Sequence, residues 1–227
     1  MTSLGRLSRL AAFMVPVLVL AGCERADADD SDGGPTLATT ADTIAFGRDL
    51  IVHHGCGDCH GGGDNPAAPV WLSGYRHPND SLFTLFKIYL PDGTMFLTRP
   101  RNLTPDNETG TGRFSERQIF NALRYGLRPG ETPDVDITSS TPGQGNFPEN
   151  PKYLAPPMPW PAFRHMTDTD LKSMAAYIKR GLKPQTNKVE PSEGPPDFWA
   201  GLYMQFYGAS VMTPAFPTAQ ETVLPPQ

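Results

Sequence analysis

The chain has 227 residues, of which 22 are glycine and 25 are proline, so about a fifth of its positions disfavour regular helix or strand. The length is enough for one domain, or two small ones, around a single hydrophobic core. The formal net charge of −5 leaves no basic excess to neutralise phosphates, which excludes a typical nucleic-acid-binding protein. The three cysteines are an odd number, which excludes a disulfide scaffold, so each needs its own explanation.

The first cysteine, Cys23, follows a segment that is typical of an export signal. Arg6 and Arg9 precede an apolar run over residues 10–20, which falls short of the ~20 residues that span a bilayer. The run ends in Leu-Ala-Gly-Cys, which resembles the lipobox of bacterial lipoproteins. We therefore predict that residues 1–22 are removed and that Cys23 carries lipid. The alternative is an ordinary signal peptide with a chance cysteine.

Residues 23–40 are predicted to form an acidic, flexible tether between that lipid and a folded domain. The segment contains four aspartates and few bulky apolar residues. Loss of residues 1–22 would remove two arginines and change the net charge from −5 to −7. Glu24, in the place of an aspartate, is compatible by resemblance with sorting to the outer membrane of a Gram-negative cell. The sequence thus predicts a protein that lipid anchors on the periplasmic side of a bacterial membrane.

The other two cysteines belong to a Cys-x-x-Cys-His motif, made by Cys56, Cys59 and His60, which is the pattern for covalent haem attachment. Two thiols three positions apart can add to the two vinyl groups of one porphyrin, and the adjacent histidine becomes the proximal iron ligand. A redox-active thiol pair would need a surrounding βαβ pattern, and a zinc site would need further ligands. Because the motif occurs once, we predict one covalently attached haem c.

Met158 is the predicted sixth ligand of the haem iron. It lies in a proline-rich loop over residues 155–163, in which Trp160 and Phe163 would provide an apolar wall. Most methionines fill gaps in cores, and Met174, on an apolar helical stripe, is predicted to do so. The alternatives are a histidine ligand and an open iron position. The remaining candidates are His53, His54, His77, His165, Met95, Met166, Met204 and Met212.

The first of three predicted helices covers residues 41–54, with Thr40 as its N-cap. Gly47 lies on its apolar face, where glycine costs about 1 kcal/mol of helix propensity relative to alanine. We attribute that glycine to the close approach of another helix. His53 and His54 stand at the end of this helix and are predicted to face solvent.

Capping boxes predict the starts of two further helices. Residues 115–118 read Ser-Glu-Arg-Gln, and Gly126 is the expected stop of the helix that follows. Residues 167–170 read Thr-Asp-Thr-Asp, and apolar residues then recur at helical spacing until Gly181. Both apolar faces are interpreted as core-forming.

Two segments between these helices are predicted to lack helix. Residues 86–90 and 94–97 flank Pro-Asp-Gly, which suggests a small β-hairpin. Residues 128–154 are rich in Pro, Thr, Ser and Gly and predict an irregular surface excursion. The excursion is either an inert insertion or an element that docks a partner or shields the haem edge.

Four stretches together resemble class I c-type cytochromes, and in particular the cytochrome subunits that accompany periplasmic alcohol and aldehyde dehydrogenases. These stretches are residues 47–60, 101–106, 108–115 and 157–160. The resemblance runs from about residue 44 to 184. It implies an all-α, cytochrome c-like fold, with three main helices around one haem, long irregular loops and a small hairpin.

The resemblance also implies particular contacts. The first and last helices would cross with Gly47 near Tyr177, Met158 would ligate the iron, and the loop over residues 101–106 would lie against the haem. Such subunits often carry two or three haem motifs, whereas this chain has one.

The chain is therefore divided as follows: signal peptide 1–22, tether 23–40, cytochrome c domain 41–185 and a proline-rich and aromatic tail 186–227. An aromatic stripe in the tail is interpreted as packing on its own domain, with a partner surface or the membrane interface as alternatives.

We predict a membrane-anchored periplasmic monohaem cytochrome c that carries single electrons between redox proteins and has no catalytic residues of its own. The acidic charge favours partners with basic patches. One alternative is a haem subunit fixed in a larger oxidoreductase or reaction-centre complex. The other is a haem enzyme with a displaceable distal ligand.

Overall fold

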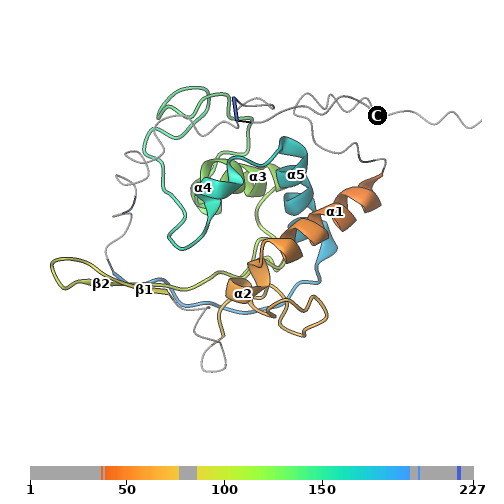
Figure 1. Ribbon diagram of the computed structural model, residues 1–227, viewed down its shortest axis with the longest axis horizontal. Helices are drawn as coiled ribbons and strands as arrows, with labels where there is room; N and C mark the ends of the chain where they lie inside the picture. Colours follow the sequence, from red (N-terminus) through yellow and green to blue (C-terminus); the bar gives the residue numbers. More distant parts are fainter. Residues whose placement is uncertain (1–36, 38, 77–85, 195–198, 200–218, 221–227) are drawn as a thin grey trace, which may run out of the picture.

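The computed structural model describes residues 37, 39–76, 86–194, 199 and 219–220. Its elements are α1 (Thr40–His53), α2 (Cys56–His60), β1 (Phe86–Tyr89), β2 (Met95–Thr98), α3 (Glu116–Tyr125), the 3-10 turn η2 (Pro129–Glu131), α4 (Trp160–Phe163), α5 (Asp168–Ala176) and the π-helical turn η3 (Tyr177–Gly181). The regular structure is mostly helical, and the β1–β2 hairpin extends away from the helices (Figure 1). The predicted lipid site Cys23, most of the tether and most of the tail lie outside the described residues.

Helix α1 begins one residue earlier than predicted. Its N-cap is Thr39, whose side chain accepts a hydrogen bond from the Asp42 N–H at 3.1 Å, so the assignment of Thr40 as the cap was wrong. Thr39 and Thr40 carry the same hydroxyl group, but only Thr39, whose backbone is extended, places its hydroxyl within reach of that N–H. The helix ends at His53, and His54 is its C-cap.

The close helix approach predicted at Gly47 is confirmed. A Cβ at this position would overlap the Ser173 carbonyl and lie 3.1 Å from the Met174 nitrogen, both in α5. The contact lies one helical turn before Tyr177, and α1 also packs along η3 (Figure 1). Because the obstructing atoms are backbone, only glycine allows α1 and α5 this separation.

Both predicted capping boxes are present. At the start of α3, the Ser115 hydroxyl accepts from the Gln118 N–H, and the Gln118 amide oxygen accepts from the Ser115 N–H. Thr167 and Asp170 make the equivalent pair at the start of α5. Helix α3 ends at Tyr125, and Gly126, the predicted stop, is its C-cap with a left-handed φ of 67° that suits glycine.

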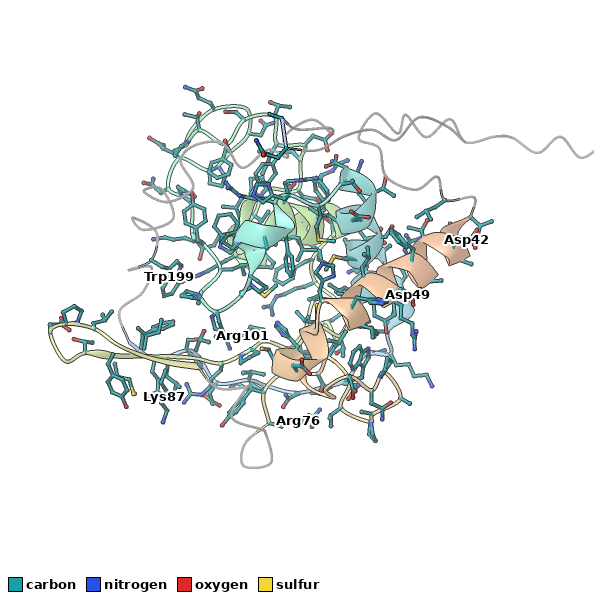
Figure 2. The ribbon with its side chains drawn as sticks, viewed as in Figure 1. Asp42, Asp49, Arg76, Lys87, Arg101 and Trp199 are labelled. Carbon is teal, nitrogen blue, oxygen red and sulfur yellow. The ribbon has the colours of Figure 1, made fainter. Side chains whose placement is uncertain are left out.

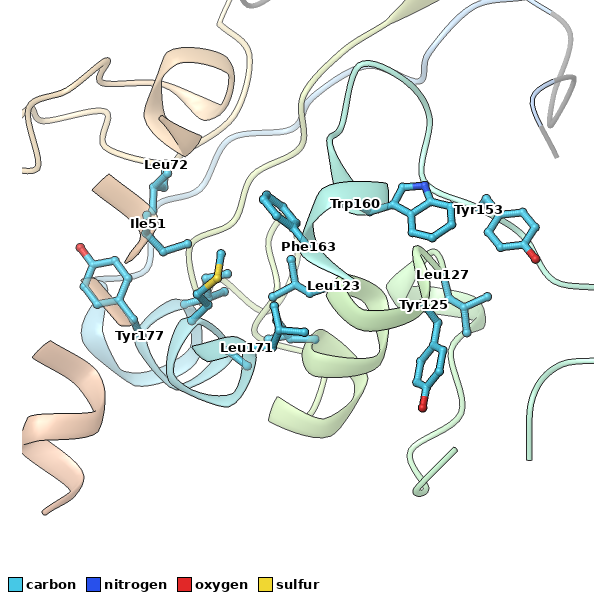
Figure 3. Packing of buried hydrophobic residues seen from close by; sticks show 14 of the residues in the cluster. Ile51, Leu72, Leu123, Tyr125, Leu127, Tyr153, Trp160, Phe163, Leu171 and Tyr177 are labelled. Atoms are coloured by element: carbon cyan, nitrogen blue, oxygen red, sulfur yellow. The ribbon is translucent and has the colours of Figure 1, made fainter. Parts of the chain in front are cut away.

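The hydrophobic core runs between these helices and includes residues from the irregular segment before Met158. Figure 3 shows it extending from Tyr177 and Ile51, past Leu171 and Phe163, to Trp160. The described helices include none that is long and apolar enough to cross a bilayer.

Residues 128–154 are mostly irregular, as predicted, but they are more than a surface excursion. Ile137, Phe147 and Tyr153 are buried in the core, and the Tyr125 hydroxyl donates to the Ile137 carbonyl at 2.8 Å. The polar composition of the segment hid these three side chains, which are too far apart in the sequence to form a periodic pattern.

The predicted hairpin is confirmed. Strands β1 and β2 pair antiparallel, with Phe86 opposite Thr98 and Tyr89 opposite Met95. The turn between them is closed by the Leu90 N–H, which donates to the Thr94 carbonyl at 2.8 Å.

Candidate haem site

The Cys-x-x-Cys-His motif forms its own short helix, α2, immediately after α1. Cys56 and Cys59 lie three positions apart and therefore share one face of this turn. Both are partly buried thiols that are not joined in a disulfide. Burial, followed by the neighbouring Cys59 thiol, raises the pKa of Cys56 to about 12, and burial also raises the pKa of Cys59. Redox-active dithiols have lowered pKa values, so these environments do not favour the thiol-pair alternative.

His60 is buried at the end of α2, and its ring is fixed by the main chain. The Nδ1 atom lies 2.7 Å from the Arg101 carbonyl oxygen, which can only accept, so Nδ1 carries the proton and Nε2 keeps its lone pair. Burial lowers the pKa of His60, with an opposing contribution from that hydrogen bond. A neutral imidazole anchored through one nitrogen is the form that binds a metal through the other.

Hydrogen bonds of the buried Asn102 side chain hold the loop over residues 101–106 in the position from which it contacts His60. Asn102 is 2% exposed, and its amide nitrogen donates to the Gln185 carbonyl at 2.7 Å and to the Thr109 hydroxyl at 3.0 Å. Its amide oxygen accepts from the Thr104 N–H and hydroxyl. The sequence indicated this loop only through the family resemblance, and the hydrogen-bonding role of Asn102 was missed.

Two glycines shape the backbone around α2. At Gly57, between the two cysteines, a Cβ would overlap the Gly63 carbonyl and the ring of Trp71. The Trp71 indole N–H donates to the Tyr177 hydroxyl at 3.0 Å, which links the motif to η3. Gly55 joins α1 to α2 in a left-handed conformation with φ 62°. The motif's position is therefore set by packing beneath it as well as by its own helix.

Met158 lies partly buried at the border of the hydrophobic core, which Cys56 also borders. The segment that precedes Met158 is hydrogen-bonded to the end of α3, because the Leu154 N–H donates to the Gly126 carbonyl at 2.6 Å. The interpretation of residues 155–163 as a loop throughout was wrong, because Trp160–Phe163 form the short helix α4. Four residues are too few to produce helical periodicity.

Trp160 and Phe163, the two predicted wall residues, are 1% and 3% exposed. Trp160 covers Gly126, where a Cβ would overlap the indole, and stacks on Tyr153 with ring centroids 5.7 Å apart. Both rings belong to the core that Met158 borders (Figure 3).

The other candidate iron ligands have different environments. His53 and His54 are exposed, as predicted, with Nδ1 atoms on the Asp49 and Leu50 carbonyls at 2.7 and 2.8 Å. Met174 is fully buried, which confirms its predicted core role. Further candidates are His165, exposed; Met166 and Met95, partly buried; and His77, Met204 and Met212, outside the described residues.

The donor set fits a haem c. It comprises an anchored neutral imidazole, two thiols on one helical face that are not joined in a disulfide, and a thioether at the border of the same core. Across the part of the chain that the structure describes, no group of three or more His, Cys, Asp or Glu side chains could hold a metal ion.

No family model matches the chain. It is similar to the cytochrome c subunit of a quinone alcohol dehydrogenase from Gluconacetobacter polyoxogenes, with 29% identity over 113 residues, covering 50% of this chain and 19% of that protein. The fructose dehydrogenase cytochrome subunit of Gluconobacter japonicus is 29% identical over 174 residues, covering 77% of this chain and 28% of that protein.

The gluconate 2-dehydrogenase cytochrome c subunit of Pantoea cypripedii is 31% identical over 100 residues, covering 43% of this chain and 18% of that protein. The chain thus spans less than a third of the length of these curated relatives. The predicted similarity to cytochrome c subunits of dehydrogenases is confirmed.

Proposed function

We propose that this protein is a monohaem c-type cytochrome that transfers single electrons as the haem subunit of a larger oxidoreductase. The observation that carries the proposal is His60, whose Nδ1 is held by the Arg101 carbonyl and which shares one short helix with the thiols of Cys56 and Cys59. A haem bound there would supply one-electron iron redox chemistry.

Each proposed site residue has a separate task. Cys56 and Cys59 would hold the porphyrin through thioether bonds, which suits a protein outside the cytoplasm. His60 would ligate the iron through Nε2, and Met158 would supply the second protein ligand. Trp160 and Phe163, both buried, would keep water from the Met158 side. A ligand set that is the same in both oxidation states leaves little to rearrange when an electron moves.

The sequence favoured a free electron carrier, with a fixed subunit as the alternative. The names of the similar proteins favour the alternative, because each is a cytochrome subunit of a dehydrogenase. We propose that Cys23 carries lipid and places the protein on the periplasmic face of a bacterial membrane, with the outer membrane favoured. Its partners would then be redox proteins, and catalysis of substrate oxidation would belong to another subunit.

The proposal is tested by producing the full chain in a host that matures c-type haem. We expect one haem per chain that resists acid-acetone extraction, and loss of it in the Cys56→Ala/Cys59→Ala double variant. The Met158→Ala variant is expected to lose the methionine–iron charge-transfer band, whereas Met166→Ala, another partly buried methionine, should keep it.

Three results would count against this function: a wild-type protein without covalent haem, a charge-transfer band that survives Met158→Ala, or rapid carbon monoxide binding by the reduced wild type. Co-purification of the lipidated chain with a dehydrogenase would distinguish a subunit from a free carrier.

A further inference from the structure

Three arginines belong to segments that adjoin the residues of the candidate haem site. Arg99 donates through Nη1 to the Pro191 carbonyl at 2.6 Å. Arg101 donates through Nη1 to the Val189 and Glu190 carbonyls at 2.8 and 3.1 Å. Both guanidinium groups therefore reach the same segment of chain after η3. Figure 2 shows Arg101 on the side of the molecule from which the hairpin extends.

The third arginine, Arg128, comes from the turn after α3. Its Nε donates to the Tyr153 carbonyl at 3.1 Å, and its guanidinium carbon lies 5.8 Å from the centre of the Trp199 ring. Burial lowers the pKa of Arg101, and the positive charges of Arg99 and Arg128 lower it further. Arg99 and Arg128 therefore each lie close enough to Arg101 for their charges to act on it. The Trp199 ring that Arg128 approaches also packs on Phe96 of β2, with ring centroids 4.8 Å apart.

Two carboxylates also face this cluster. Glu193 pairs with Arg99, and the charge of Glu190 raises the pKa of Arg101. Both glutamates are exposed. Among the described groups named here, three positive side chains face two negative ones, in a chain whose net charge is −5. An anionic group is the chemistry that such a cluster recognises.

The backbone connections of the arginines show where that anion would lie. The main chain of Arg101 binds the ring of His60, the proposed proximal ligand. Arg128 binds the main chain of Tyr153, five residues before Met158, the proposed distal ligand. The cluster therefore joins the two segments that support the iron ligands, and a haem carries its two propionate carboxylates on one edge.

We propose that Arg101, together with Arg128 and Arg99, binds the propionate carboxylates of the haem. This inference rests on the proposed function. Guanidinium groups pair with carboxylates through two parallel hydrogen bonds, and partly buried pairs are screened little by salt. The positive charges would also favour the reduced iron, because they offset the electron that arrives.

The test uses the haem-loaded full chain and compares Arg101→Gln, Arg101→Lys and Arg128→Gln with wild type. The matched control is Arg117→Gln, which removes a positive charge from an exposed side chain on α3. The glutamine substitution at 101 keeps the main-chain carbonyl that binds His60. The measurements are the midpoint potential by spectroelectrochemistry and the propionate bending bands by resonance Raman.

We expect Arg101→Gln and Arg128→Gln to lower the midpoint potential of the haem. Each tenfold shift of the one-electron equilibrium towards the oxidised form corresponds to a fall of about 59 mV. Both should shift the propionate bands, whereas Arg117→Gln should change neither and Arg101→Lys should lie between. If Arg101→Gln does not accumulate, Arg128→Gln decides the question by the same two measurements.

Normal haem content with potentials and propionate bands equal to those of Arg117→Gln would overturn the inference and leave the proposed function standing. A change seen only in the rate of association with an acidic redox partner would also overturn it, because the carboxylates would then belong to the partner. Absence of haem from the wild type would instead refute the proposed function itself.

Discussion

Replacing Gly47 with alanine is expected to destabilise the protein at the contact between α1 and α5. An added Cβ would overlap the Ser173 carbonyl and approach the Met174 nitrogen to 3.1 Å. Overpacking of this kind costs about 1–3 kcal/mol, and the upper end applies because backbone atoms cannot rotate away. Alanine returns about 1 kcal/mol through its better helix propensity. The expected net loss is therefore about 2 kcal/mol.

Thermal unfolding of the haem-loaded protein, followed by far-ultraviolet circular dichroism, measures this loss. At roughly 2–4 °C for each kcal/mol in a chain of this size, we expect Tm to fall by about 4–8 °C. The matched control is Gly130→Ala, where a Cβ would meet only the Phe114 ring at 3.9 Å. That variant should be neutral or slightly stabilised. A Gly47→Ala protein as stable as Gly130→Ala would refute the argument from helix contact.

Three further substitutions test the structure around the site. Asn102→Ala should lower the free energy of unfolding by about 1–3 kcal/mol in urea titrations, because buried partners lose their hydrogen bonds, and an unchanged midpoint would contradict this. Ser115→Ala should cost about 1 kcal/mol by the same assay through loss of the N-cap, and a cost near zero would mean that the cap contributes nothing. Hydrogen bonds from the Thr109 hydroxyl and N–H hold the pKa of Asp106 below its usual range. The ionised carboxylate therefore stabilises the folded protein at pH values above its unfolded-state pKa, and this stabilisation is lost as the pH falls through the folded-state pKa. Asp106→Asn should therefore be less stable than wild type at neutral pH, with a difference that disappears in acid; a difference independent of pH would contradict the assignment.

Local signals predicted the parts of the fold that depend on neighbouring residues. The capping boxes at Ser115 and Thr167 located two helix starts to the residue, because a side chain and an N–H three positions apart satisfy each other wherever the helix packs. The cap of α1 was misplaced by one residue, since Thr39 and Thr40 differ only in backbone conformation.

Contacts between segments that are distant in the sequence could not be predicted from such local signals. The Arg101 carbonyl that orients His60 is 41 residues away and belongs to the main chain, so no residue type signals it. The burial of Ile137 and Phe147 depends on how an irregular segment folds back on α3, which composition does not specify. The spacing of the motif predicts Cys56, Cys59 and His60 as a set, whereas the packing beneath them, through Gly57 and Trp71, was missed.

Residue Arg101 affects the proposed site in two separate ways, through its main chain and through its side chain. The His60 ring is oriented by a peptide carbonyl, which every amino acid supplies, so mutation of the Arg101 side chain leaves that anchor in place. The side chain of the same residue extends instead to the Val189 and Glu190 carbonyls. Single substitutions at position 101 can therefore change the side-chain charge there while the hydrogen bond that orients the His60 ring is kept.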